Sequence, residues 1–426
     1  MEGMFTRWIV VLAMSAFYMS DAEAQPKDAN YDEAKVGDYT LPDPLKMENG
    51  EPVGDGKAWR EKRRPELLRL FETHVYGRSP GKPETLIFKK TSEDKYALGG
   101  RATRREVSIY FKEDLSGPKL DLLLYIPNKA EKPVPAFLGL NFDGNHTINK
   151  DPGISVTKNW VPNRRDSDIT ENRATLETRG RSTGRWEAEK IMEAGYALAT
   201  MYAGDIDPDF DDGFTNGVHA LYPKPGPEDW GTIAAWAWGL SRAMDYLETD
   251  KEIDAKKVAV IGHSRLGKTA LWAGATDERF AITISNNSGC GGAALSRRIF
   301  GETVGRINLS FPHWFCDNYN KYNENENACP VDQHQLIALI APRPVYVASA
   351  TEDTWADPKG EFLGAKHADP VYKLLGMEGL PAEEMPEADQ PVTGTIGYHL
   401  RTGKHDVTAY DWEQYIKFAN QHFGRK

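Results

Sequence analysis

The sequence predicts an α/β fold with a mostly parallel, doubly wound sheet and helices on both faces. Apolar segments of strand length recur along the chain, and helical segments separate the later ones, as in strands joined by crossover helices. Residues 258–261 form an apolar, mostly β-branched run, followed at once by Gly-His-Ser and by a helical segment at 268–275. This corner indicates a buried parallel strand, and sites in such folds lie beyond the carboxyl ends of the strands.

The individual elements are predicted from local patterns of apolar residues. We expect strands at residues 105–111, 120–126, 136–142, 197–202, 258–261, 281–285, 345–350 and 394–400. Helical spacing predicts helices at 64–75, 229–247, 268–275, 336–341 and 411–423. Two long segments, 146–186 and 297–335, do not fit this alternation, and we expect them to be loops inserted over the active site.

The amino terminus has the pattern of a cleavable signal peptide. Arg7 precedes an apolar run at residues 8–19, and Ala22-Glu23-Ala24 is a small-x-small cleavage site. The run is too short to span a bilayer. We therefore expect a signal peptide at 1–24, a secreted or periplasmic protein, a polar N-terminal arm at 25–60 packed on the domain, and one α/β domain at 61–426.

Charge and composition exclude several partners. The formal net charge of −11 argues against nucleic acid, and no other stretch is apolar enough to cross a membrane. Metal-binding Cys/His spacing and Walker or dinucleotide loops are absent from the sequence, so we expect no metal and no organic cofactor. Three cysteines, Cys290, Cys316 and Cys329, permit at most one disulfide, whose pairing the sequence does not fix. We expect a monomer that acts on a small-molecule or polysaccharide substrate.

The first insert is rich in arginine and allows two interpretations. The arginines are Arg164, Arg165, Arg173, Arg179, Arg181 and Arg185, and their acidic neighbours are Asp166, Asp168, Glu171 and Glu177. The mixture of charges is typical of a solvated face, while the excess of arginine would also suit a basic rim for an anionic ligand.

Ser264 occupies the corner between strand and helix, where a serine is lifted above the sheet beside helix-terminal N–H groups. The pattern departs from the usual nucleophile elbow, because Leu266 stands where the second glycine is expected and Gly267 follows one place late. A Gly-x-Ser-x-x-Gly motif also arises by chance or for structural reasons. The flanking strand and helix favour a catalytic nucleophile.

A nucleophilic serine needs a base, and in a hydrolase of this topology the base is a histidine after the last strand. His405 follows the strand that ends near Leu400 and precedes the last helix, whereas His399 lies inside the strand and is expected to be structural. The orienting acid should follow the strand 345–350. Asp353 is the best-placed carboxylate there, with Glu352 and Asp357 as close rivals. Asp332, before the helix 336–341, is expected to be a helix cap.

Two further side chains are candidates for substrate contact. Lys268 stands four residues after Ser264, on the same helix face, where it would meet a substrate carboxylate or hydroxyl or extend into solvent. Trp355 lies two residues beyond Asp353 and would offer a sugar ring an apolar platform or pack in the core.

The motif Gly262-x-Ser264-Arg265-x-Gly267-Lys268 resembles the hallmark of the glucuronoyl esterases, carbohydrate esterase family fifteen. Five other segments resemble its bacterial-type members: 140–147, 202–208, 311–316, 349–358 and 402–408. The resemblance, which extends from about residue 60 to the C-terminus, implies an α/β-hydrolase fold. It also implies a serine esterase that cleaves 4-O-methylglucuronoyl esters between xylan side groups and lignin alcohols.

The resemblance also assigns roles to residues. It implies that Ser264 is the nucleophile, that His405 is the base, and that Arg265 stabilises the oxyanion through its backbone N–H and guanidinium. The remaining implied roles belong to Lys268, Glu302 and Trp355, which match positions that hold the uronate hydroxyls and ring.

One departure from the fungal relatives concerns the acid. They carry a glutamate after the strand that contains Ile284, whereas this chain has Ser-Asn-Asn-Ser at 285–288, and Asn287 cannot be the acid. Asp353 matches the alternative acid of bacterial members. An acetyl or feruloyl esterase on the same fold, and a non-catalytic carbohydrate-binding protein, are the alternative functions.

Overall fold

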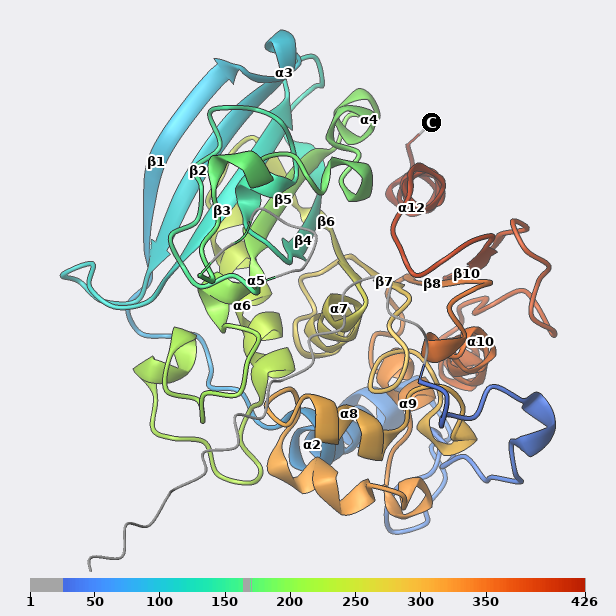
Figure 1. Cartoon of the computed structure of the whole chain (residues 1–426). Coiled ribbons are helices and arrows are strands. Elements are labelled where there is room, and N and C mark those ends of the chain that lie inside the picture. The colour runs from blue at the N-terminus through green and yellow to red at the C-terminus, as the bar shows by residue number, and fades with distance from the viewer. Residues whose placement is uncertain (1–25, 164–168, 170, 426) are drawn as a thin grey trace, which may run out of the picture.

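The computed structural model describes residues 26–163, 169 and 171–425, and within them a 10-stranded sheet has the order β1-β2-β3-β5-β4-β6-β7-β8-β10-β9 (Figure 1). The strands are β1 (Ile87–Tyr96), β2 (Ala102–Tyr110), β3 (Lys119–Pro127), β4 (Val134–Asn141), β5 (Ala197–Tyr202), β6 (Ile253–His263), β7 (Ile282–Asn286), β8 (Val345–Ala350), β9 (Val392–Thr393) and β10 (Ile396–Arg401). From β5 to β10 neighbouring strands are parallel, while β1, β2 and β3 form an antiparallel edge that joins β5. The predicted α/β class with a mostly parallel sheet is confirmed.

The helices differ in length and regularity. The α-helices are α1 (Gly56–Ala58), α2 (Arg64–Phe71), α3 (Ala97–Gly100), α4 (Ala188–Glu193), α5 (Ala203–Ile206), α6 (Thr232–Leu247), α7 (Arg265–Thr276), α8 (Val304–Ser310), α9 (Gln333–Ala338), α10 (Pro358–His367), α11 (Asp369–Leu374) and α12 (Ala409–Phe423). Two π-helical turns, η2 (Trp59–Arg63) and η3 (Glu72–Tyr76), flank α2. The 3-10 turns are η1 (Glu33–Lys35), η4 (Asn145–Thr147), η5 (Leu176–Thr178), η6 (Thr183–Arg185), η7 (Gly217–Leu221), η8 (Ser296–Arg298), η9 (Asp317–Tyr322), η10 (Glu326–Ala328) and η11 (Thr354–Ala356).

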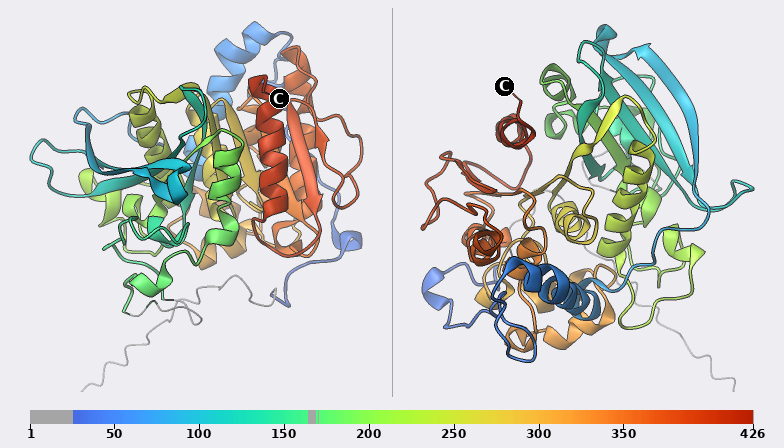
Figure 2. Two further views of the ribbon diagram at one scale, coloured as in Figure 1. Left: turned by 90° about the horizontal axis from the view of Figure 1, so that it is seen from above. Right: turned by 180° about the vertical axis from the view of Figure 1, so that it is seen from behind.

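Strand β6 supplies side chains to both faces of the sheet. Val258 and Val260 belong to one hydrophobic core with α6 and α7, whereas Ala259 and Ile261 belong to a second core with α4 and α12. Figure 1 shows these helix pairs on opposite sides of the sheet, and the two views of Figure 2 agree. Because successive residues of a strand point to opposite faces, a stretch covered on both sides, here 258–261, is apolar at every position. This explains why the sequence revealed β6 so clearly.

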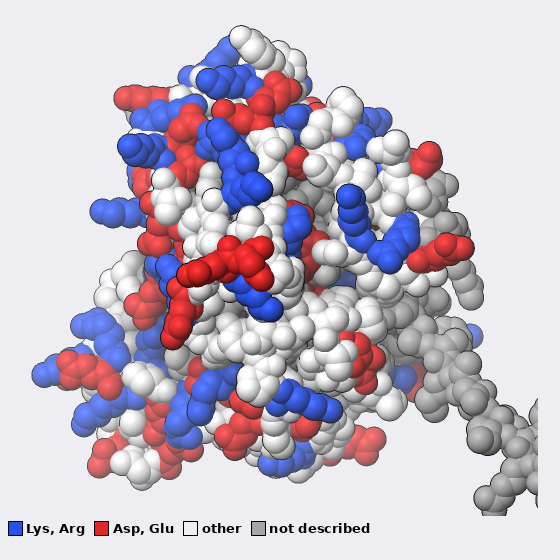
Figure 3. Space-filling view, turned by 90° about the vertical axis from the view of Figure 1, so that its left-hand side faces the viewer, with Lys and Arg blue, Asp and Glu red and all other residues white. Residues whose placement is uncertain are grey.

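Strand β1 was not predicted, because its sequence is polar. Lys89, Lys90 and Lys95 are exposed along it, and it pairs with β2 alone. Lysines on an edge strand discourage pairing with another chain. Figure 3 shows the face that contains β1, where acidic and basic side chains are intermixed.

The N-terminal arm contacts the second insert. The N–H of Gly301 donates to the carbonyl of Asn30 (2.8 Å), and His334 Nε2 lies 2.8 Å from the carbonyl oxygen of Pro42. Arg298 forms an ion pair with Glu33. The arm is therefore attached at several points to the segment that contains Glu302.

Three of the arginines in the first insert bond within the protein. Arg179 donates to the carbonyls of Asp151 and Ile154, Arg185 forms an ion pair with Asp406 (2.6 Å), and a third, Arg173, donates to a backbone carbonyl. Arg173 and Arg179 thus bond within the insert, whereas Arg185 attaches it to the residue after His405. The insert residues Arg164, Arg165, Asp166 and Asp168, like the predicted signal peptide, lie outside the described residues.

The three cysteines are free thiols. Cys290, Cys316 and Cys329 are all buried and unpaired with one another, so the disulfide that the sequence allowed is not formed. Within the described part of the chain, no helix is both long and apolar enough to cross a membrane.

Candidate active site

Ser264 lies in a sharp corner between β6 and α7. Its backbone has φ 57° and ψ −130°, a conformation that costs a non-glycine residue energy. A Cβ added at Gly262 would lie 1.8 Å from the carbonyl oxygen of Leu266, so the corner closes only with glycine there. The N–H of Ser264 donates to the carbonyl of Asn286 (2.9 Å), which ties the corner to the end of β7.

The displaced second glycine has a packing role. A Cβ at Gly267 would lie 3.0 Å from the Cβ of Ser288 and 3.1 Å from the carbonyl oxygen of Asn286. The first turn of α7 therefore packs against the chain that leaves β7. This close approach gives a physical reason for a glycine at 267.

His405 and Asp353 meet at the carboxyl ends of β10 and β8. His405 Nδ1 lies 2.6 Å from Asp353 Oδ2. A carboxylate only accepts hydrogen bonds, so Nδ1 carries the proton and Nε2 is left as the basic nitrogen. The ring centroids of His405 and His263, the residue before Ser264, are 4.5 Å apart. His405 therefore lies next to the corner.

The two loops that carry this pair are bonded to each other. The N–H of Glu352 donates to the carbonyl of Gly403 (2.9 Å), and the N–H of Gly403 donates to Thr351 Oγ1 (3.0 Å). These bonds continue the pairing of β8 and β10 beyond the sheet and fix the two loops relative to each other.

The Asp353 carboxylate has a second partner. Asn287 Nδ2 donates to Asp353 Oδ2 (2.8 Å) from the left-handed position after β7, where φ is 46°. Burial would raise the pKa of Asp353, but the charge and hydrogen bond of His405, together with the Asn287 amide, hold that pKa below its ordinary value. Asn287, which the sequence excluded as the acid, thus supports the carboxylate that faces the histidine.

The rival residues have other partners. Asp357 forms a buried ion pair with Arg298 (2.8 Å) and caps α10, and Glu352 is exposed. Asp332 forms a capping box at α9, as predicted. His399 is buried between Asp411 (2.9 Å) and Tyr346, also as expected for a structural histidine.

Arg265 is held by an aspartate that the sequence did not reveal. Its Nε lies 2.6 Å from Asp209 Oδ2, and its guanidinium carbon lies 4.6 Å from the ring centroid of Phe142. Asp209 also accepts from Trp314 Nε1 (2.7 Å) and lies 3.1 Å from His313 Nε2. Although burial opposes it, the charge of Arg265 holds the pKa of Asp209 below its ordinary value. The only sequence signal was that Asp209 directly follows one family-like segment, 202–208.

Lys268 is buried rather than extended into solvent. Its Nζ donates to the carbonyls of Ser288 (2.7 Å) and Cys290 (2.6 Å) and to Glu302 Oε2 (3.2 Å). An ammonium has three donors, and each has an acceptor here. The interpretation that Lys268 extends into solvent is wrong. Substrate contact by Lys268 stays a prediction.

Glu302 and Trp355 lie in adjacent segments. The N–H of Glu302 donates to the carbonyl of Trp355 (2.9 Å). The Glu302 side chain is 9% exposed, and Trp355 is partly exposed rather than part of the core. The structure thus places both near the turn that follows β7, and Lys268 links Glu302 to that turn.

Glu361, on α10, was also missed. Its Oε1 accepts from the N–H groups of Ser288 (2.6 Å) and Gly289 (3.0 Å), and its Oε2 accepts from Ser349 Oγ (2.6 Å). Glu361 binds the amides of the turn whose carbonyls Lys268 binds. Burial raises the pKa of Glu361 to about 7.

Among the described residues, no group of three His, Cys, Asp or Glu side chains is arranged to hold a metal ion.

The mostly parallel sheet, the serine corner and the histidine–aspartate pair define an α/β-hydrolase, and comparison with known proteins specifies its class as a carboxylic ester hydrolase. A family model for fungal glucuronyl esterases matches residues 188–376. The carbohydrate esterase MZ0003, from an unknown prokaryotic organism, is 56% identical over 421 residues, which are 97% of each chain. A 4-O-methyl-glucuronoyl methylesterase of Schizophyllum commune is 26% identical over 86% of this chain and 81% of its own.

Two solved structures of esterases also resemble this chain. A promiscuous esterase of carbohydrate esterase family 15 from a marine bacterial metagenome has a TM-score of 0.88 at 58% identity, covering 92% of this chain and 100% of its own. The glucuronoyl esterase of Solibacter usitatus has a TM-score of 0.86 at 53% identity with the same coverage. This chain belongs to that family, the glucuronoyl esterases, as a bacterial-type member.

The corner at Gly262 yields a stability prediction. Gly262→Ala should lower the free energy of unfolding by at least about 3 kcal/mol, because its Cβ would overlap the Leu266 carbonyl. Gly37→Ala, where no atom lies within 4 Å of the added Cβ, is the control and should change it by about 0.5 kcal/mol or less. Urea unfolding measures both. Equal stabilities of the two variants would contradict the close approach.

Glu361 yields a pH prediction. Between its ordinary pKa of 4.5 and the folded value of about 7, the folded chain keeps a proton that the unfolded chain has lost. The free energy of unfolding therefore falls as pH rises through this window. Glu361→Gln has no carboxyl to titrate and does not show this fall. The free energy of unfolding of the variant minus that of the parent should therefore increase from pH 4.5 to pH 7. Urea unfolding at stepped pH measures it, and a constant difference would contradict the burial of a titrating carboxyl.

Proposed function

We propose that this chain is a secreted serine esterase that hydrolyses 4-O-methylglucuronoyl esters through Ser264, His405 and Asp353. The observation that carries the proposal is the 2.6 Å hydrogen bond from His405 to Asp353 beside the serine corner. Relatives named 4-O-methyl-glucuronoyl methylesterases support the substrate class. The natural substrate would be the ester that links glucuronoxylan to lignin alcohols.

The proposed reaction has two halves. Ser264 attacks the ester carbonyl while His405 Nε2 takes its proton, and the same imidazole then protonates the leaving alcohol. The acyl group is now a covalent ester on Ser264. Water, deprotonated by His405, attacks this ester, and His405 returns the proton to the Ser264 oxygen as the uronic acid leaves. Arg265 stabilises the oxyanion in both halves through its backbone N–H and guanidinium, which Asp209 holds in place.

Recognition of the uronate is assigned to Glu302, Trp355 and Lys268. The Oε2 atom of Glu302 is bonded to Lys268 (3.2 Å), so Oε1 is the atom that would accept from sugar hydroxyls. Trp355 would place its ring against the sugar. Lys268 would contact the sugar only by sharing or exchanging one of its three present acceptors.

The rest of the proposal concerns the whole chain. We propose that residues 1–24 are a signal peptide, that 25–60 form an arm on the catalytic domain 61–426, and that the enzyme is a monomer without a nucleic-acid or membrane partner. The contacts of Asn30 and Glu33 with the segment before Glu302 support the arm.

A broader carbohydrate esterase is the second candidate, because the 58% identical structure is described as a promiscuous esterase. We expect kcat/KM to be higher for benzyl glucuronate than for an aryl acetate, since in the proposal Glu302 and Trp355 would contact a sugar acyl group and not an acetyl group. Ser264→Ala should abolish both activities and labelling by a fluorophosphonate. A preference for acetate by orders of magnitude would contradict the proposed substrate, and retained hydrolysis in Ser264→Ala would contradict the nucleophile.

The acid is tested by two neutral substitutions of neighbouring carboxylates. Asp353→Asn should lower kcat by about 10⁴-fold, because an amide at this position no longer stabilises the correct imidazole tautomer. Glu352→Gln is the matched control, and its exposed side chain should leave kcat within about threefold. Steady-state kinetics on benzyl glucuronate measure both. A large loss in Glu352→Gln with a small loss in Asp353→Asn would reassign the acid.

A further inference from the structure

We propose that a cavity beside β3 and β5 binds a neutral stretch of the polysaccharide chain whose side group carries the ester. This inference rests on the proposed function. The cavity, called here the β3–β5 cavity, has a volume of about 920 Å³ and is lined among others by Lys119, Asp121, Asn159, Trp160, Asp205 and Pro208. Its volume is in the range of about 300–1,000 Å³ typical of small-ligand sites.

The β3–β5 cavity contains a buried carboxyl that forms no ion pair with a described lysine or arginine. Asp205 is 5% exposed, and its Oδ1 accepts from Asn159 Nδ2 (2.7 Å) and, at 3.4 Å, from Thr157 Oγ1. Lys119, whose charge favours the ionised form of Asp205, bonds to Asp121 (2.5 Å) rather than to Asp205. A backbone hydrogen bond from Asp121 partly offsets the cost of burying Asp205. Burial, with the charge of Asp121, raises the pKa of Asp205 to about 7. Such a group is suited to hydrogen-bond sugar hydroxyls.

An aromatic wall faces the same space. The carbonyl of Trp160 accepts from the hydroxyl of Tyr202 (2.7 Å), and its ring packs on Phe210 with centroids 4.7 Å apart. Trp160 and Tyr202 both line the cavity. Fixed aromatic rings with amide, hydroxyl and carboxyl groups are the combination that suits a polyhydroxylated ring with apolar faces.

Charge selects a neutral sugar over a uronate. The lining contains three acidic residues, Glu106, Asp121 and Asp205, and two lysines, Lys119 and Lys158. Above pH 7, where the Asp205 carboxyl is ionised, this leaves an excess of one negative charge. Like charges repel a carboxylate ligand. The unsubstituted main chain of a polysaccharide, rather than its uronate side group, therefore fits this cavity.

The cavity lining is connected to Arg265 through neighbouring residues of the chain. Pro208 lines it, and the next residue, Asp209, holds Arg265 at 2.6 Å. Asn145 lines it too, and Phe142, three residues earlier, lies under the Arg265 guanidinium. We infer that a chain whose ester lies at Ser264 extends into this cavity.

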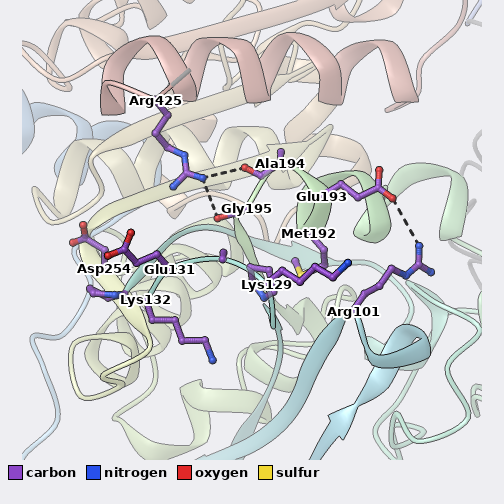
Figure 4. A pocket seen from close by; sticks show the side chains of 13 residues that line it. Arg101, Lys129, Glu131, Lys132, Met192, Glu193, Ala194, Gly195, Asp254 and Arg425 are labelled. Atoms are coloured by element: carbon purple, nitrogen blue, oxygen red, sulfur yellow. Dashed lines mark hydrogen bonds and ion pairs between the residues drawn. The ribbon is translucent and has the colours of Figure 1, made fainter.

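A second cavity, of about 860 Å³, serves as a comparison. Its wall includes Pro133, Gly195 and Asp254, which lie at the amino ends of β4, β5 and β6, at the sheet edge opposite Ser264. Figure 4 shows Lys129 in this cavity, and Arg425 bonded to the backbone of Ala194 and Gly195. A ligand that continues from the ester does not reach it, so Lys129 provides a control position.

Calorimetric titration of full-length Ser264→Ala with xylotetraose, a neutral oligosaccharide, tests the inference. We expect binding at about pH 8, where the Asp205 carboxyl is mostly ionised. Under these conditions Asp205→Asn in that background should weaken binding about tenfold or more through loss of a charge-assisted acceptor. Trp160→Ala should also weaken binding, whereas Lys129→Ala should not. Thermal unfolding of each variant establishes that it is folded. If Trp160→Ala fails to fold, Asp205→Asn still tests the inference, because it keeps the shape of the side chain.

The inference would be overturned by no binding of xylotetraose, or by an unchanged Kd in Asp205→Asn. Tighter binding of glucuronic acid than of xylotetraose, sensitive to Asp205→Asn, would also overturn it, because the cavity would then take the anion. These titrations use an inactive chain. Failure to hydrolyse benzyl glucuronate would therefore contradict the proposed function and leave the binding result intact.

Discussion

The hydrogen bonds to the Asp353 carboxylate are the interaction on which the candidate site depends. The carboxylate follows β8, His405 follows β10, and Asn287 follows β7, so three adjacent strands must end together for these groups to meet. A buried carboxylate without partners would be costly, and here two donors compensate. The sheet register thus determines the orientation of the histidine.

Around this cluster, charged side chains hold the backbone rather than face solvent. Lys268 and Glu361 bind opposite sides of the turn after Asn287, through its carbonyls and its amides respectively. Asp209 fixes Arg265 in a similar way. Groups fixed before the substrate arrives need no reorganisation when charge develops, which is the main advantage of a preorganised site. In this chain the side chains that support the site, such as Glu361 and Asp209, are themselves charged.

The sequence predicted those features whose signal is local. The apolar run 258–261, the two glycines near Ser264 and the loops that contain Asp353 and His405 are each legible within a few residues, and the structure brings the last two together. The sequence did not reveal β1, which is a polar edge strand, and it did not reveal the supporting roles of Glu361 and Asp209. Glu361 meets Ser288 across 73 positions, and Asp209 meets Arg265 only after β5 and β6 have paired through β4, so no local spacing reports either contact. The free thiols and the buried ammonium of Lys268 likewise follow from packing that a single sequence does not display.

The orientation of His405 by Asp353 is tested most directly by proton NMR of the imidazole Nδ1–H. A proton held between Nδ1 and a buried carboxylate exchanges slowly and gives a downfield resonance, assigned to His405 by its loss in His405→Gln. We expect this resonance in the parent and in Glu352→Gln, and its disappearance in Asp353→Asn. The same resonance in Asp353→Asn would show that another group orients the histidine and would contradict the assignment of Asp353.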